Sequence, residues 1–411
     1  MNQHSATLLT WEKASALLIM AAIFLLTLNT RLTSGKFSGS SASVNHGLPA
    51  TSTVLWHAGN FRYLNALPDK LLTYVDTLPH PTGGAYRKLS STRKASFNLF
   101  LDALFKAIDD SLADGSTGDW CGVKAKAADA NYEVIRFYDT DTGRWFIHGY
   151  DKTSDGQAYF FINPFAKRNI VIEVPHERYE PGTALEGARL FTALAARALI
   201  INNEDRCSSP TATGCNIGTT TACADGRVRE SDMAHEVSNA FYLLHVRYTD
   251  MDPVTKFVQL HGFNYDPMKH AQKVVIGDSS TKDILTTSVS VTFANNLKQF
   301  VPTDETAAVE SCQQSAGKPN PSLCGEASVE GRYANNPLSD ACANFTSNSK
   351  SRFLHIEQAP TVRDDDDSDG WYWGDINEAL IRTWGGCNMN NGATDCTLGS
   401  QQTQYSTWTC P

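Results

Sequence analysis

The spacing of hydrophobic residues changes along the chain, and the change marks where predicted helices give way to predicted strands. From about residue 55 to residue 128, hydrophobic residues recur at helical spacing. In ASFNLFLDALFKAIDDSL this spacing aligns Phe97, Phe100, Leu101, Leu104 and Phe105. From residue 130 onward, short runs rich in β-branched and aromatic residues follow: YEVIRFYD, RWFIHGYD, AYFFINP and NIVIEVP. The turn-like TDTG and TSDG between the first three runs indicate an antiparallel meander.

After His176 the predicted strands alternate with predicted helices. The helical stretches are ALEGARLFTALAARA, SDMAHEVSNAFYLLHVRY with Ser231 as its N-cap, and WYWGDINEALIRTW. The strand-like runs are ALII, KFVQLHGF, KVVIGD and RFLHIEQ. This alternation, after an antiparallel lead-in, predicts an α/β protein with a mixed, partly antiparallel central sheet between two helical layers.

The first part of the chain has a different composition. After Lys13 comes ASALLIMAAIFLLTL, an apolar run of 15 residues, which suits a signal peptide and is shorter than the roughly 20 residues of a membrane span. No small-x-small cleavage motif follows closely, so a retained anchor stays an alternative. We predict a signal or anchor at 1–30, a Ser/Gly-rich linker at 31–50, a helical segment at 51–129 that packs on the main domain, and a main domain at 130–411.

Charge and cysteine content narrow the class of protein. The formal net charge is −9, with no basic run, which argues against a nucleic-acid partner. Contact with a membrane is expected only through an N-terminal anchor. The ten cysteines form no CxxC pair and cluster in irregular stretches, including the C-terminal tail. This pattern predicts up to five disulfides and an oxidising compartment, extracellular or periplasmic. The sequence does not indicate an oligomeric state.

Several polar residues immediately follow predicted strands, where ligands bind in open α/β sheets. VIEVPH ends at His176, ALIINNEDR leads to Arg206, and FVQLHG carries His261. FLHIEQ carries His355 and, two places later, Glu357. Catalytic zinc typically takes two histidines and one carboxylate and keeps an open position for water. We therefore predict one zinc ion per chain, held by the set of His176, Glu180 and His261.

We also predict functions for the polar residues around this zinc site. Glu357 is the predicted general base, and Arg206 is predicted to anchor a substrate carboxylate or to stabilise the oxyanion. His235 and His355 are weaker candidates for substrate binding. Each residue also has a structural alternative: a buried strand-end histidine, a solvated turn glutamate, or an arginine paired with Glu204 or Asp205.

Common catalytic motifs are missing from the chain. HERYE and HEVSN lack the second histidine of HExxH, and there is no GxSxG, Walker A or GxGxxG motif. The acidic run DDDDSDG places Asp365, Asp367 and Asp369 in the opening spacing of a calcium loop, but the twelfth position is Ile376. A weak calcium site at these three residues and a solvated acidic loop are both compatible with this run.

The order of these residues resembles zinc carboxypeptidase-like hydrolases. EPGT, from Glu180 to Thr183, is similar to the turn after the strand-end histidine in the poly-γ-glutamate hydrolase branch, and LHG and FLHIEQ are similar to its later ligand and base strands. N-formylglutamate amidohydrolases are more distantly similar. The resemblance implies a phosphorylase/hydrolase-like α/β/α fold with His176, Glu180 and His261 on zinc. The His-to-Glu spacing differs from both groups, and the Asn-Arg pair of carboxypeptidases is missing.

The leading hypothesis is a secreted zinc-dependent hydrolase of an amide bond, in a peptide, a γ-glutamyl compound or another small amide. A non-catalytic extracellular binding module on the same fold is one alternative, because WYWGD could stack on sugars. An esterase or deacetylase with the same zinc site is another.

Overall fold

The computed structural model describes residues 70–78, 86–113, 118–153, 155–202, 204–218, 222–268, 271–282, 284–314, 321–363 and 373–385. The predicted signal or anchor, the linker, the acidic run with Asp365, Asp367 and Asp369, and the C-terminal tail lie outside these residues. Within them, no helix is both long enough and apolar enough to cross a membrane.

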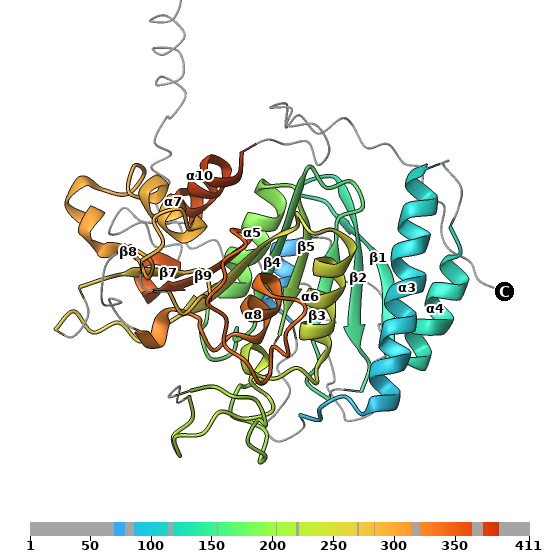
Figure 1. The fold of residues 1–411 in the computed structure, drawn as a ribbon. Coiled ribbons are helices and arrows are strands. Elements are labelled where there is room, and N and C mark those ends of the chain that lie inside the picture. Colours follow the sequence, from blue (N-terminus) through green and yellow to red (C-terminus); the bar gives the residue numbers. More distant parts are fainter. Residues whose placement is uncertain are drawn as a thin grey trace, which may run out of the picture. The chain divides into compact units, whose positions relative to one another are not determined.

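Nine strands of the described residues form one mixed sheet in the order β1-β2-β3-β5-β4-β6-β9-β7-β8 (Figure 1). Their bounds are β1 Tyr132–Asp139, β2 Arg144–Asp151, β3 Tyr159–Ile162, β4 Arg168–Val174, β5 Ala196–Ile201, β6 Lys256–Gly262, β7 Val274–Gly277, β8 Val309–Ser311 and β9 Phe353–Gln358. The predicted α/β class with a mixed, partly antiparallel sheet is therefore confirmed.

The strands at the centre of the sheet run parallel, whereas those at one flank are antiparallel. β5, β4, β6 and β9 pair in parallel. β1, β2 and β3 form the predicted antiparallel meander. β3 then pairs with β5 rather than with β4. The carboxyl ends of β4, β6 and β9 consequently lie side by side in the middle of the sheet.

Helices pack on both faces of the sheet (Figure 1). Because successive strand residues point to opposite faces, Ile170 and Ile172 of β4 join one hydrophobic cluster and Val171 joins the other. Helices α2, α5, α7 and α10 contribute to the first cluster, and α3, α4, α6 and α8 contribute to the second. The bounds are α2 Leu71–Asp76, α3 Ser91–Ala113, α4 Trp120–Asp129, α5 Thr183–Ala193, α6 Ala240–Met251, α7 Val289–Leu297, α8 Val329–Asn335, α9 Pro360–Arg363 and α10 Trp373–Trp384.

One predicted helix is confirmed only in its C-terminal part, and the difference matters for the site. Instead of a helix that begins after Ser231, the chain forms a short 3₁₀ helix, Met233–His235, and then α6. The cap of α6 is Asn239, whose side chain accepts a hydrogen bond from the backbone of Tyr242. Because of this break, residues 231–239 are not part of a continuous α-helix. Two further 3₁₀ helices, Thr303–Ala308 and Pro321–Leu323, lie later in the chain.

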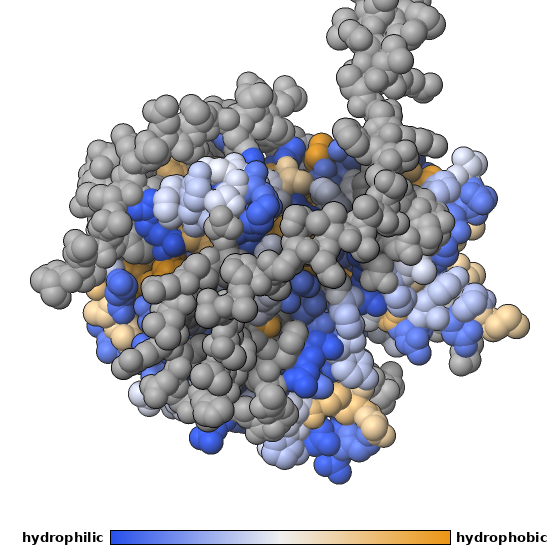
Figure 2. All heavy atoms as spheres, turned by 180° about the vertical axis from the view of Figure 1, so that it is seen from behind, coloured by the Kyte–Doolittle hydropathy of each residue, from blue (hydrophilic) through white to orange (hydrophobic). Residues whose placement is uncertain are grey.

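Disulfides join the loops of the described chain. They link Cys207 to Cys223, Cys215 to Cys342 and Cys312 to Cys324. None of the described cysteines is free. Such bonds persist in oxidising surroundings, so these three indicate an extracellular type of compartment. On the face drawn in Figure 2, hydrophilic and hydrophobic side chains of the described residues are interspersed.

Candidate metal centre

The candidate centre lies at the carboxyl ends of β4, β6 and β9. His176 follows β4 directly after Pro175, and His261 is the penultimate residue of β6. In the parallel pairing of β6 with β9, His261 lies opposite Glu357. The sheet therefore brings together three of the residues that the sequence places at strand ends.

A tight turn carries Glu180 back to His176. The backbone N–H groups of Tyr179 and Glu180 both donate to the carbonyl of His176, at 2.8 Å. Gly182 has a φ of 94°, a conformation that glycine adopts without strain, and it lets α5 begin at Thr183. Glu177 points elsewhere, because its carboxylate accepts hydrogen bonds from Thr183 and from the backbone of Ala184.

The carboxylate of Glu180 lies between the two histidines. Its Oε1 is 3.1 Å from Nδ1 of His176, and its Oε2 is 3.3 Å from Nδ1 of His261. The backbone N–H of Gly262 also donates to Oε2, at 2.9 Å. All three side chains are buried, and their ligand atoms lie within 4.8 Å of one another. This group can hold a metal ion.

Asp232, which sequence reasoning missed, fixes the orientation of the His176 ring. Its Oδ1 is 2.9 Å from Nε2 of His176. A carboxylate only accepts hydrogen bonds, so Nε2 carries a proton. Without metal Nδ1 also carries a proton toward Glu180, and a metal ion bound at Nδ1 would replace that proton. A carboxylate behind a ligating histidine is a common feature of zinc sites. Two histidines and a carboxylate with this support fit a zinc ion.

Arg206 forms ion pairs with two acidic side chains of the centre, Asp232 and Glu180. Its guanidinium donates from Nε to Oδ2 of Asp232 at 2.8 Å and contacts Oε1 of Glu180 through Nη1 at 3.4 Å. The structure thus places Arg206 against Asp232 and Glu180, rather than against Glu204 or Asp205 as its structural alternative supposed. These contacts neutralise part of the buried negative charge that the site carries.

Glu357 and His355 lie on the other side of His261. Oε1 of Glu357 is 3.2 Å from Nε2 of His355. Oε2 of Glu357 is buried and has no hydrogen-bond partner among the described residues. The rings of His261 and His355 are 4.2 Å apart, centroid to centroid. His261, His355 and Glu357 form a second group that can hold a metal ion, and it shares His261 with the first.

His235 reaches the centre because the predicted helix is broken before α6. Its Nδ1 is 2.7 Å from Oδ1 of Asp232, and its ring lies parallel to that of His176 at 6.5 Å between centroids. His176, Asp232 and His235 form the third group that can hold a metal ion. All the histidines predicted for the site therefore lie in one cluster.

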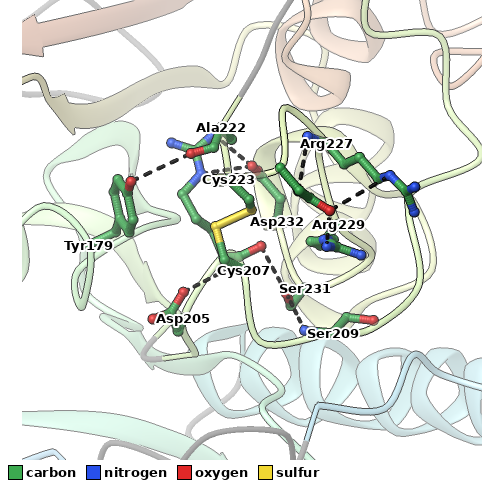
Figure 3. The surroundings of a disulfide bond; sticks show 12 residues. Tyr179, Asp205, Cys207, Ser209, Ala222, Cys223, Arg227, Arg229, Ser231 and Asp232 are labelled. Atoms are coloured by element: carbon green, nitrogen blue, oxygen red, sulfur yellow. Dashed lines mark hydrogen bonds and ion pairs between the residues drawn. A yellow bond between two sulfur atoms is a disulfide. The ribbon is translucent and has the colours of Figure 1, made fainter.

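A disulfide-closed loop borders the centre (Figure 3). Cys207, which follows Arg206 in the chain, is bonded to Cys223. The hydroxyl of Tyr179 donates to the carbonyl of Ala222 at 3.4 Å, and the hydroxyl of Ser231 donates to the carbonyl of Arg206 at 2.9 Å. The disulfide thus joins the two ends of the loop next to the segments that carry Glu180 and Asp232.

The pKa values of the two histidines differ because their neighbours differ. Burial and Arg206 disfavour the charged form of His176, but Asp232 and Glu180 outweigh them and raise its pKa to about 9. Burial and the nearby His355 lower the pKa of His261 to about 4. Burial acts against ionisation of Glu180, yet His176 and His261 hold its pKa well below the ordinary range.

Without bound metal, the protein is expected to lose stability as the pH rises toward 9. The folded-state pKa of His176 is about 9 and its ordinary value is 6.5. The stabilisation from this raised pKa is complete below 6.5 and is lost as the pH passes through 9, by up to roughly 3 kcal/mol. Urea unfolding in the presence of a chelator, between pH 6 and 9.5, measures the loss. A matching series on His176→Ala should lack this component, and an equal slope in that variant would contradict the assignment.

Asp232→Asn is expected to weaken zinc binding about 10- to 100-fold, because the amide cannot accept from His176 and from Arg206 together. Competition with a fluorescent chelator gives the Kd. Asp278→Asn is the control, since Asp278 is a buried aspartate whose carboxylate accepts from Ser288 outside the centre. Equal zinc affinity in the two variants would contradict the supporting role of Asp232.

The chain was compared with known protein families and with curated proteins. No protein-family model matches the chain, and no curated protein matches it significantly. The resemblance to carboxypeptidase-like hydrolases therefore rests on the residues quoted from the sequence.

Proposed function

We propose that the chain is a zinc-dependent hydrolase of an amide bond. The observation that carries the proposal is the position of Glu180, which is within 3.3 Å of Nδ1 of both His176 and His261 at the carboxyl edge of the sheet. Fully buried polar side chains at such an edge are costly unless they are paired or bind a ligand. A buried group of two histidines and one glutamate is a usual catalytic zinc ligand set.

His176 and His261 would each bind the ion through Nδ1, and Glu180 would bind it through its carboxylate. When bound, zinc lowers the pKa of a water molecule and polarises a carbonyl group. Asp232 would keep the His176 ring in its ligating tautomer. Arg206 would keep Asp232 and Glu180 ionised, because a guanidinium beside a carboxylate favours its charged form.

Glu357 is the proposed acid and base. Its pairing with His261 in the sheet register puts it beside the metal ligands. His355 orients the carboxylate through Oε1, and Oε2 has no other partner among the described residues. This oxygen would accept a proton from the attacking water and return it to the leaving nitrogen, so that no net proton is gained or lost by the side chain.

The substrate class follows from the resemblance of EPGT and LHG to poly-γ-glutamate hydrolases. We propose a peptide or γ-glutamyl amide, a three-layer carboxypeptidase-like fold, and release of the protein into an oxidising compartment. The helices on both faces of the sheet and the three disulfides support these parts of the proposal.

Elemental analysis of the purified chain tests the proposal first. About one zinc ion per chain is expected, as a three-ligand site implies. Hydrolysis is then measured on a panel of γ-glutamyl amides, α-peptides, esters and acetylated amines. Zinc with cleavage of amides supports the proposal, and cleavage of esters or acetyl groups alone replaces the substrate class. Absence of zinc after metal loading would refute the hydrolase as described.

A further inference from the structure

A glutamine lies directly behind the proposed zinc ligand His261. Gln259 precedes His261 by two residues on β6, so both side chains point to the same face of the sheet. In the sheet register Gln259 lies between Glu173 of β4 and His355 of β9. Gln259, Glu173 and Glu330 are completely buried. A buried amide between carboxylates and histidines is expected to have a defined orientation.

The two ends of the Gln259 amide have different partners. Its carbonyl oxygen Oε1 is 3.0 Å from Nε2 of His261. The same oxygen accepts a hydrogen bond from the hydroxyl of Ser328, at 3.2 Å. Its amide nitrogen donates to Oε2 of Glu330 at 3.2 Å and lies 3.4 Å from Oε2 of Glu173.

The two carboxylates determine which end of the amide faces His261. Rotation of the amide by 180° would lose the two hydrogen bonds that its nitrogen donates to Glu173 and Glu330 and the one that its oxygen accepts from Ser328. Both carboxylates are themselves held in place. Glu173 contacts Nδ1 of His245 on α6 at 2.7 Å through its other oxygen, and Glu330 lies in the first turn of α8, where Ser328 is the cap.

The orientation of the amide sets the tautomer of His261. Both neighbours of the ring offer acceptors, but the contact of Nε2 with Oε1 of Gln259, at 3.0 Å, has hydrogen-bond geometry, whereas Nδ1 makes a longer contact of 3.3 Å with Glu180. The proton is therefore expected on Nε2, and the lone pair is left on Nδ1. Nδ1 of His261 is 3.3 Å from Oε2 of Glu180. The lone pairs of these two atoms are then both available to one metal ion. The rotated amide would put the proton on Nδ1 and close the ligand position.

We propose that Gln259 is a positioning residue for metal binding, and that Glu173 and Glu330 hold it in the orientation that makes His261 a ligand. This inference rests on the proposed zinc site. The ring nitrogen Nε2 of each histidine then contacts a different kind of group. For His176 the group is the carboxylate of Asp232, and for His261 it is the amide of Gln259, which two carboxyl groups hold in place.

Two substitutions of Gln259 separate positioning from packing. Gln259→Met keeps the length of the side chain and removes the acceptor, so zinc affinity is expected to fall about 10- to 100-fold. In Gln259→Glu the new carboxyl group is expected to be protonated, because Glu173 and Glu330 lie beside it. Its O–H would donate to one of these two residues, and its other oxygen would still accept from His261. This variant is expected to keep zinc affinity near that of the unmutated chain, although both variants lose stability. Ser290→Ala removes a buried hydrogen-bonding side chain outside the centre and is the packing control.

Zinc Kd by chelator competition and the tautomer of His261 are both measured. With ¹⁵N-labelled histidine, NMR of the metal-free unmutated chain should show the Nε2–H form of His261, and Gln259→Met should lose that preference. Unchanged zinc affinity in Gln259→Met, or an Nδ1–H form in the unmutated chain, would overturn the inference. If the unmutated chain bound no zinc, the proposed function would fail, and the NMR result would still decide the role of Gln259.

Discussion

His176→Ala is expected to lose the zinc ion, so that metal content falls from about one ion per chain to none after dialysis. The substitution removes one of three proposed ligands. It also leaves Asp232 and Glu180 buried without the ring that joins them, at 2.9 and 3.1 Å. Elemental analysis and chelator competition on the same preparation measure the effect, and amide hydrolysis is expected to disappear with the metal.

The control for this variant is His148→Ala. His148 is also completely buried and hydrogen-bonded, to the hydroxyl of Tyr74 and the carbonyl of Phe160, but it lies outside the candidate centre. Both variants lose a buried ring and are expected to be less stable. Only His176→Ala should lose zinc. Loss of zinc from both, or from neither, would remove His176 from the ligand set.

Glu357→Gln should retain zinc and lower the hydrolysis rate by about 10²- to 10⁴-fold, the usual contribution of general acid–base catalysis. The amide has nearly the shape of the carboxylate and can still contact His355. It cannot accept a proton at the position of Oε2. Steady-state kinetics on the best substrate of the amide panel give kcat, and metal analysis shows whether the centre is intact.

Glu186→Gln is the matched control for Glu357→Gln. Glu186 is a buried glutamate with one oxygen that has no hydrogen-bond partner in the described part of the chain, and its other oxygen accepts from Gln358. Burial raises the pKa of Glu186 to about 7, but the residue belongs to none of the groups of described residues that can hold a metal. Full activity of Glu357→Gln with zinc bound would assign the proton transfer to another side chain.

The sequence predicted most of the sheet, because its strands are strongly patterned. The runs YEVIRFYD and RWFIHGYD coincide with β1 and β2, and FLHIEQ coincides with β9. The three-residue β8 was missed, since a strand of that length has too few residues for a period. The helix expected from ALEGARLFTALAARA ends at Ala193, and its last residues belong to β5.

The site was predicted only in part, for a physical reason. Residues that follow strands in the sequence meet at one edge of a parallel sheet. The proximity of His176 and His261 could therefore be predicted from their positions at strand ends. Asp232 was assigned to a regular helix, and nothing in SDMAHE shows that the helix breaks there. Gln259 is a neutral residue in an apolar strand, and its importance depends on Glu173 and Glu330, which come from distant segments.

The place of β9 in the sheet has a consequence for biosynthesis. β9 is the last of the described strands to leave the ribosome, yet it is inserted between β6 and β7. Until residues 353–358 are made, both neighbours have an open hydrogen-bonding edge, and such edges pair readily with other chains. Nascent chains that stop before Phe353 are therefore expected to depend on chaperones and to be degraded. A premature stop codon upstream of this strand should abolish accumulation of the protein, which immunoblotting measures.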